Sequence, residues 1–83
     1  MSGGSHHHGS VEVADIAHHV ATQLAAIGQR FTSNRKQIVT ALTEAQRPLS
    51  IPEILDITGL AQSSAYRNLT VLENARVVVR VIS

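Results

Sequence analysis

The sequence predicts a mainly α fold: a winged helix-turn-helix with four helices and a C-terminal wing strand that is incomplete. Three observations predict it. Apolar residues recur at three- and four-residue steps in four stretches, a pattern typical of helices that bury one face. A short turn at Thr58–Gly59–Leu60 separates the third stretch from the fourth, as in a helix-turn-helix. The last residues, "VVVRVI", form a β-branched run that is typical of a strand.

The composition limits the chain of 83 residues to one small domain. Residues 1–10, "MSGGSHHHGS", have the glycine, serine and histidine content of an expression leader, so residues 11–83 are assigned to the winged helix domain. The lack of cysteine excludes disulfides and a thiolate zinc site. No apolar run approaches the ~20 residues of a membrane span. We therefore expect a cytoplasmic protein that does not associate with membranes.

The first two helices are expected at about residues 11–27 and 33–46. Gly28 is the predicted left-handed cap that ends the first helix, and Thr32 is the predicted N-cap of the second. Each helix has one apolar stripe, formed by Val13, Ile16, Ala17, Val20, Leu24 and Ile27 in the first and by Ile38, Val39, Ala41, Leu42 and Ala45 in the second.

A short third helix is expected between Ser50 and Gly59. Ser50 and Glu53 have the spacing of a capping box, and Pro52 fits the first helical turn. The fourth helix is expected at about residues 62–74. The predicted core residues are Ile54, Leu55 and Ile57 in the third helix and Ala65, Leu69 and Leu72 in the fourth.

The polar residues of the fourth helix indicate what this helix contacts. Ser63, Tyr66, Arg67, Thr70 and Asn74 share the face opposite its leucines because they recur at helical spacing. In a helix-turn-helix, the start of the second helix enters the DNA major groove. An arginine there can bind guanine O6 and N7 or a phosphate, hydroxyls can contact either, and a tyrosine can contact thymine methyls or phosphate. Ser64 is a further hydroxyl at this end of the helix.

The charge distribution agrees with an anionic partner. The formal net charge is only +1, but from Gly28 onward seven basic residues face four acidic ones. Residues 11–27 contain only the acids Glu12 and Asp15. The basic residues therefore lie in the part of the chain that contains the predicted helix-turn-helix.

Nothing in the sequence predicts an enzyme or a metal site. The chain contains neither a nucleophile elbow nor a glycine-rich phosphate loop. His6–His8 belong to the leader, and Asp15, His18 and His19 offer too few ligands for a stable metal site. We interpret Asp15 and His19 as a solvated pair on a helix surface.

Three stretches, "GQRFTSNRKQIVTAL", "RPLSIPEI" and "SSAYRNLTVLENARVV", resemble the DNA-binding domain of the ferric uptake regulator family of metal-responsive bacterial repressors. The similarity is greatest to actinobacterial members. Its most specific part is Tyr66–Leu69, preceded by serines, and the spacing of Gly28, Arg30, Thr32 and Arg35 agrees with it.

The resemblance implies that a helix at about 62–74 reads a double-stranded operator DNA as part of a homodimer. Arg30 would approach phosphates, Lys36 would hold the DNA backbone, and Arg35 would either reach phosphate or brace the packing of the helices. The candidate DNA-binding residues are thus Arg30, Arg35, Lys36, Ser63, Ser64, Tyr66, Arg67 and Thr70.

The chain departs from this family pattern in three places. Pro48 stands where the family has a metal-binding histidine, and Arg76 stands where it has a glycine after the recognition helix. Either the helix cap differs there, or Asn74 takes the turn. The family's C-terminal domain, which dimerises and binds iron, zinc or a similar metal, is also missing. We therefore expect a fragment without a cofactor, either monomeric or weakly self-associating through a terminal strand that has no partner in the chain.

One alternative keeps the same scaffold without DNA. In it, the domain is a protein-interaction module whose fourth helix docks another protein.

Overall fold

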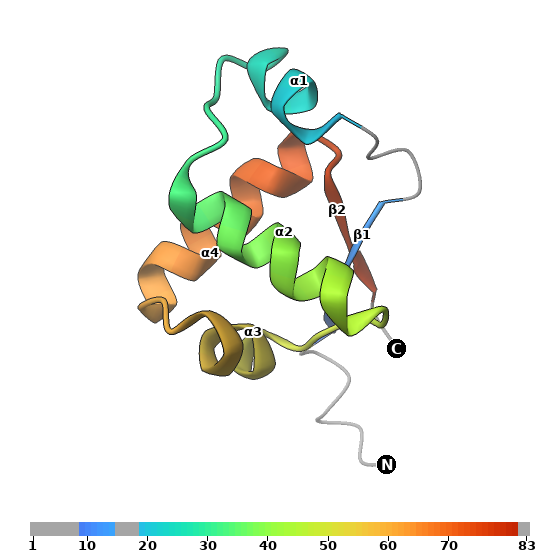
Figure 1. Cartoon of the computed structure of the whole chain (residues 1–83), viewed down its shortest axis with the longest axis vertical. Coiled ribbons are helices and arrows are strands. Elements are labelled where there is room, and N and C mark those ends of the chain that lie inside the picture. The colour runs from blue at the N-terminus through green and yellow to red at the C-terminus, as the bar shows by residue number, and fades with distance from the viewer. Residues whose placement is uncertain (1–8, 15–18, 82–83) are drawn as a thin grey trace.

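The structure, a computed structural model, describes residues 9–14 and 19–81. It confirms the mainly helical winged helix-turn-helix class, with four helices and a two-stranded antiparallel sheet in the described residues (Figure 1). None of the described helices is long and hydrophobic enough to span a bilayer. In chain order the elements are β1 (Ser10–Val13), α1 (Val20–Ala25), α2 (Ser33–Ala45), α3 (Ile51–Thr58), α4 (Gln62–Asn74) and β2 (Val78–Val81).

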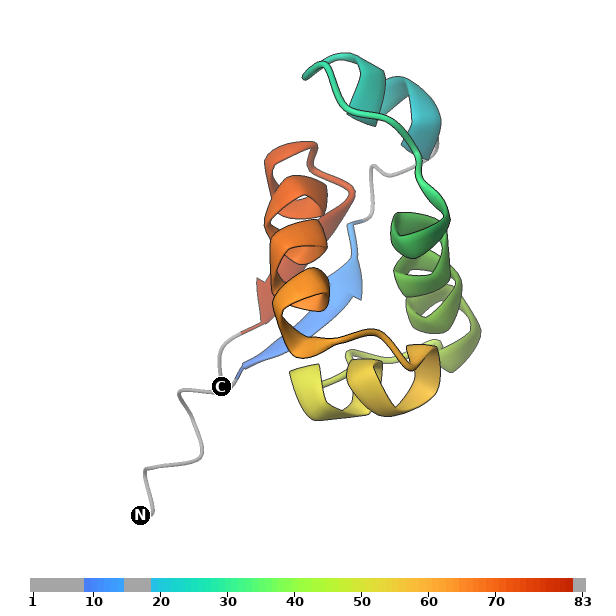
Figure 2. The same cartoon turned by 90° about the vertical axis from the view of Figure 1, so that its left-hand side faces the viewer.

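The core lies where α2, α3 and α4 meet. Figure 2 shows α4 and α2 facing each other, with α3 across one end of the pair. The helices fold this way because each has one apolar stripe to remove from water. The largest fully buried side chains are Leu24, Ile38, Leu49, Ile54, Leu69, Leu72, Val77 and Val78.

The predicted caps of α2 and α3 are confirmed, whereas α1 ends at Ala25, three residues before the left-handed Gly28 that was predicted to end it. Thr32 Oγ1 accepts a hydrogen bond from the N–H of Arg35, and Ser50 forms a reciprocal capping box with Glu53. Gly59 has φ +73°, a left-handed conformation that costs glycine little. It ends α3 and allows the chain to turn directly into α4, which completes the helix-turn-helix.

The prediction of a helix over residues 11–27 is partly wrong. Strand β1 occupies Ser10–Val13, so that even Ser10, assigned to the leader, belongs to the fold. Helix α1 covers only Val20–Ala25, and the predicted stripe residues Ile16 and Ala17 lie outside the described residues. "SVEV" also alternates with period two, and β-branched valines favour a strand when a partner strand is present.

The terminal strand does have a partner in the chain, contrary to expectation. β1 and β2 pair antiparallel, with Ser10 opposite Val81 and Val13 opposite Val78. On its other side, Val11 exchanges backbone hydrogen bonds of 2.8 and 2.9 Å with Leu49, in the link between α2 and α3. β1 therefore lies between Leu49 and β2, and its buried Val11 joins the sheet to the helical core.

Another prediction is wrong in α3. Ile57, expected on its core side, is 57% exposed, whereas Ile51 is buried beside Ile54. In an eight-residue helix the buried stripe is short, and here Ile51 and Ile54, three residues apart, form it.

The C-terminus of α4 contains a strained residue. The N–H of Arg76 bonds to the carbonyl of Glu73 and that of Val77 to the carbonyl of Leu72, the pattern of a Schellman cap. Arg76 occupies the left-handed position with φ +63°, so the alternative that Asn74 takes the turn is wrong. The cap has the ordinary geometry with an unfavourable residue in it.

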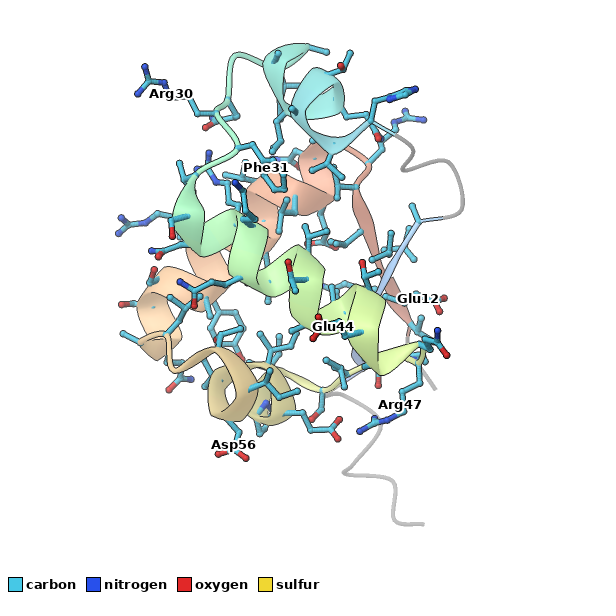
Figure 3. The ribbon with its side chains drawn as sticks, viewed as in Figure 1. Glu12, Arg30, Phe31, Glu44, Arg47 and Asp56 are labelled. Carbon is cyan, nitrogen blue, oxygen red and sulfur yellow. The ribbon has the colours of Figure 1, made fainter. Side chains whose placement is uncertain are left out.

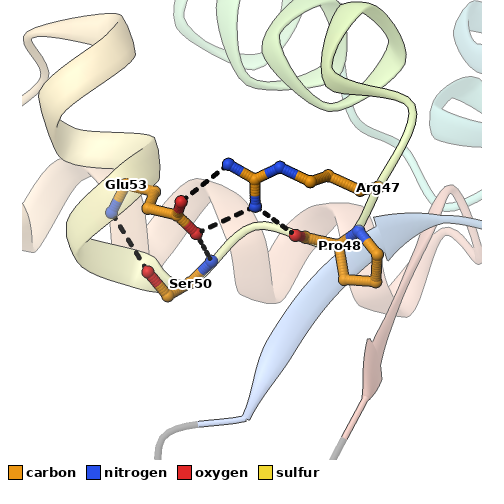
Figure 4. Close-up of polar contacts among 4 residues, drawn as sticks. All are labelled: Arg47, Pro48, Ser50 and Glu53. Atoms are coloured by element: carbon orange, nitrogen blue, oxygen red, sulfur yellow. Dashed lines mark hydrogen bonds and ion pairs between the residues drawn. The ribbon is translucent and has the colours of Figure 1, made fainter.

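A surface cluster holds the start of α3. Arg47 Nη2 lies 2.8 Å from Glu53 Oε2, and Glu53 Oε1 accepts a hydrogen bond from the N–H of Ser50 (Figure 4). The Arg47 hydrogen bond, followed by that from Ser50, lowers the pKa of the Glu53 carboxyl to about 2.

Replacing Arg76 with glycine is expected to stabilise the domain. Glycine relieves the left-handed strain, and we expect a gain of about 1 kcal/mol in the free energy of unfolding. Urea denaturation of the parent, Arg76→Gly and Arg76→Ala measures this. Alanine removes the charged side chain and keeps the strain, so an Arg76→Gly protein no more stable than Arg76→Ala would contradict the assignment.

The contribution of Glu53 to stability is expected to depend on pH. Its folded-state pKa of about 2 lies below the ordinary value of 4.5, so ionised Glu53 stabilises the domain fully above pH 4.5. This stabilisation is lost as the pH falls toward 2. The difference in unfolding free energy between the parent and Glu53→Gln, measured by urea denaturation, should therefore shrink over this range. A difference that stays constant from pH 5 to pH 2 would show that the cluster does not form in solution.

Candidate nucleic-acid interface

Helix α4 has two chemically different faces. Ala65, Leu69 and Leu72 are at most 1% exposed and pack into the core. The opposite face presents Tyr66, which is 40% exposed, and Arg67, which is also exposed. The other exposed polar residues of α4 include Ser63, Thr70 and Asn74, as the helical spacing predicted. This polar face is the candidate nucleic-acid interface.

The first turn of α4 leaves backbone donors available. Ala61 is its N-cap, and a methyl side chain cannot accept the hydrogen bonds that Thr32 and Ser50 accept at α2 and α3. Helix N-termini carry partial positive charge and bind phosphate through such N–H groups. This end of α4 thus suits an anionic ligand.

The electrostatics of α4 favour the same ligand. Between Gln62 and Leu72 the helix contains no acidic residue. Its first acid, Glu73, forms an ion pair with Arg80 of β2, in which Glu73 Oε1 lies 3.1 Å from Arg80 Nε. The charge nearest to the polar face within α4 is therefore the guanidinium of Arg67.

Two further predicted residues are exposed near the start of α2. Arg30 extends away from the body of the molecule in the link before α2 (Figure 3). Lys36 Nζ lies 5.6 Å from the centre of the Phe31 ring, a cation–π distance, and Phe31 packs against the core. Both cations are placed to meet solvent or an anionic partner.

Arg35 and Ser64 are committed to internal hydrogen bonds. Arg35 Nε donates to Asn68 Oδ1 at 2.9 Å, and its Nη1 donates to the Arg30 carbonyl at 2.8 Å. Ser64 Oγ accepts from Asn34 Nδ2 and from Asn68 Nδ2, each at 3.3 Å. These contacts give Arg35 a bracing role between α2 and α4, and its contact with DNA stays a prediction.

Thr70 uses its proton within the helix. Its Oγ1 donates to the carbonyl of Tyr66 at 3.0 Å, which leaves the hydroxyl oxygen as an acceptor toward solvent. A base or sugar donor could use that oxygen.

Asn34 and Asn68 form contacts that were not predicted from the sequence. Asn68 is 7% exposed and shares the buried face of α4. A signal was present, because Asn68 lies three residues after Ala65 and four before Leu72, in the apolar stripe. A polar residue in such a stripe indicates a hydrogen-bonded partner across the interface.

Of Asp15, His18 and His19, interpreted as surface residues of a helix, the structure describes only His19. Asp15 and His18 lie outside the described residues, and His19 is exposed. The described ranges contain no group of three or more histidine, cysteine, aspartate or glutamate residues that could hold a metal ion.

Comparison with protein families connects this geometry to known proteins. The family model described as the IclR helix-turn-helix domain matches residues 37–81, more than half of the chain. The match includes most of α2 and all of α3, α4 and β2, and thus the complete helix-turn-helix. No curated protein and no solved structure gives a significant match.

This match corrects the resemblance to the ferric uptake regulator family. The stretch "SSAYRNLTVLENARVV" lies inside the matched residues, and the findings support a DNA-binding helix-turn-helix of a different family. Serines, tyrosine and arginine suit any helix that enters a DNA groove, so these residue types do not distinguish the two families. The metal-responsive identity rested on that resemblance alone and is not supported. The chain belongs to the IclR helix-turn-helix domain family.

Proposed function

We propose that the domain binds double-stranded operator DNA through α4, with the polar face of α4 in the major groove. The family assignment supports sequence-specific DNA binding by a transcription regulator. One observation carries the proposed orientation: Tyr66 and Arg67 are exposed on the face of α4 opposite its buried leucines. In a helix-turn-helix this face of the second helix meets the base edges.

Base reading is assigned to α4. Arg67 has no acidic neighbour within its helix before Glu73, so its guanidinium can donate two hydrogen bonds to guanine O6 and N7. Tyr66 offers its ring to thymine methyls, while the hydroxyls of Ser63 and Thr70 contact base edges or phosphates. Ser64, bonded to Asn34 and Asn68, supports this face from beneath.

Backbone binding is assigned to the link before α2, the start of α2 and the first turn of α4. Arg30 is an exposed cation in the link before α2, and Lys36 is an exposed cation at the start of α2. The uncapped N–H groups in the first turn of α4 add hydrogen-bond donors. Such contacts hold a protein in register on the duplex without reading its sequence. Arg35 joins these contacts only if its remaining Nη2 atom reaches a phosphate.

The proposed function extends to the oligomeric state and the cellular location of the protein. A regulator with one recognition helix per chain gains affinity by binding two half-sites as a homodimer. We place this regulator in the cytoplasm and assign it no catalytic activity.

Binding to DNA is expected to be strongly salt-dependent. Neutralising each phosphate releases counterions, so the logarithm of the affinity should fall with that of the salt concentration by about 0.9 per phosphate contact. The parent protein is first used to select a duplex from a random pool. Fluorescence polarisation with this duplex, labelled, then measures the affinity at salt concentrations from about 50 to about 200 mM. A parent protein that retains no duplex at low salt would favour the alternative in which α4 docks a protein.

Two arginine substitutions should have different effects. Arg67→Ala is expected to cost roughly 1–3 kcal/mol on the selected duplex and little on a scrambled one, because a base contact is lost. Arg30→Ala should weaken both duplexes alike and reduce the salt slope by about 1, because a phosphate contact is lost.

The matched control is Arg47→Ala. It removes the same charge at the opposite end of α2 from Arg30, beside Glu53 (Figure 3). Its affinity for both duplexes should stay close to that of the parent. Equal binding of the selected duplex by Arg67→Ala and the parent would refute the base-reading role.

A further inference from the structure

We propose that Asn68 is a positioning residue for DNA recognition, which couples the rotation of α4 to the segment that carries Arg30. This inference rests on the proposed function, because it assigns Arg67 and Arg30 to the same duplex. Asn68 itself is 7% exposed, so it acts through its neighbours and does not touch the DNA.

On the α4 side, Asn68 is bonded within its own helix. Its Nδ2 donates to the Ser64 carbonyl at 2.9 Å and to Ser64 Oγ at 3.3 Å. The same Oγ accepts from Asn34 Nδ2 of α2 at 3.3 Å. These bonds fix the orientation of the amide, so that Oδ1 is directed at α2.

On the α2 side, that oxygen holds an arginine which in turn holds the backbone. Arg35 Nε donates to Asn68 Oδ1 at 2.9 Å, and Arg35 Nη1 donates to the Arg30 carbonyl at 2.8 Å. Two hydrogen bonds therefore connect the buried face of α4 to the peptide group of Arg30. The side chain of Arg30 extends from that peptide away from the body of the molecule (Figure 3).

The amide of Asn68 is not required for packing. Leucine has the same number of side-chain heavy atoms in a similarly branched shape, and Leu69 and Leu72 already occupy the neighbouring buried positions of α4. A buried amide must be hydrogen-bonded to avoid a desolvation cost. Here the oxygen of Asn68 accepts a hydrogen bond from α2, and its nitrogen donates one within α4. The contribution of this amide beyond apolar packing is therefore directional: it sets how α4 lies relative to the Arg30 segment.

The consequence for binding is a coupling between two contacts. When Arg67 lies in the major groove, the phosphates of the duplex lie at fixed distances from it. Arg30 therefore meets a phosphate only if the Arg30 segment keeps its distance from α4. Without the Asn68 amide, the Arg30 segment loses its connection to α4. Arg30 then no longer meets a phosphate of the selected duplex while Arg67 occupies its groove, and the preference for the selected duplex falls.

A double-mutant cycle with Arg30→Ala and Asn68→Leu tests the coupling in the whole chain. The probes are the duplex selected by the parent protein and a scrambled duplex of the same composition. In the parent, Arg30→Ala should weaken binding of the selected duplex about fivefold near 0.15 M salt. In the Asn68→Leu background the same change should weaken it about twofold or less.

Specificity is the second readout. Asn68→Leu should reduce the ratio of affinities for the selected and scrambled duplexes about threefold, with little change in the scrambled affinity. Ile38→Val, a core truncation outside this network, is the control for general destabilisation and should leave the ratio unchanged. Asn68→Asp loses the donor to Ser64 but offers Arg35 a charged acceptor, whose stronger bond offsets that loss. It should therefore retain the coupling to Arg30, which a merely structural loss would not predict.

The network can be checked apart from DNA. The Arg35 Nε–H signal in a nitrogen-15 NMR spectrum should exchange slowly in the parent and in Asn68→Asp, and rapidly in Asn68→Leu. Should Asn68→Leu fail to fold, the Asn68→Asp cycle decides, because loss of coupling there contradicts the proposal. Additive effects of Arg30→Ala and Asn68→Leu, with salt-dependent binding by the parent, would overturn the role of Asn68 and leave the proposed function standing. A parent that binds no duplex contradicts both.

Discussion

Burial of the apolar stripe of α4 is the constraint on which the rest of the structure depends. Leu69 and Leu72 are at most 1% exposed, and burying each contributes about 1.5–3 kcal/mol, more than the ~1 kcal/mol of a typical hydrogen bond. The stripe therefore fixes the rotation of α4 about its axis. Tyr66 and Arg67 face outward as a consequence, since their positions in the helix leave them no place in the core.

The two ends of α4 show how the domain combines exposure with a tight connection to the sheet. Its N-terminus follows the Gly59 turn and has only Ala61 as its cap, which leaves backbone donors beside Ser63. Its C-terminus turns through Arg76 in the left-handed region, after which Val77 and Val78 are immediately buried. The strain is located where α4 passes into the strand, and the burial of these valines offsets it.

Much of the fold could be predicted because it depends on local residues. Helix α4 has the predicted bounds, and the caps at Thr32 and Ser50 follow from side chains that reach only three residues along the chain. The strand at Ser10–Val13 was misassigned, because its partner lies more than sixty residues away and no local pattern reveals the pairing. Of the candidate site, the exposed face of α4 was predictable from helical period. The bonds that join Arg35 to Asn68 and Asn34 to Ser64 were not, since they form between α2 and α4.

The resemblance to the ferric uptake regulator family was misleading because it rested on the residue types of a polar helix face. Residues that face a DNA groove are selected by the chemistry of bases and phosphates, so unrelated winged helices arrive at similar polar faces. The matched residues 37–81 include the buried stripes of α3 and α4 along with the polar face, so the match covers more than the groove-facing residues that the two families share.

Contact between the outward face of α4 and DNA can be observed directly by NMR. Backbone amide signals of the nitrogen-15-labelled chain would be followed while the selected duplex is added. We expect the largest shifts on residues 61–70, at the N-terminal end of α4, and around Arg30, with small shifts in the outer face of α3 around Asp56. Shifts concentrated in α3 or β2, with the signals of Tyr66 and Arg67 unchanged, would contradict this contact.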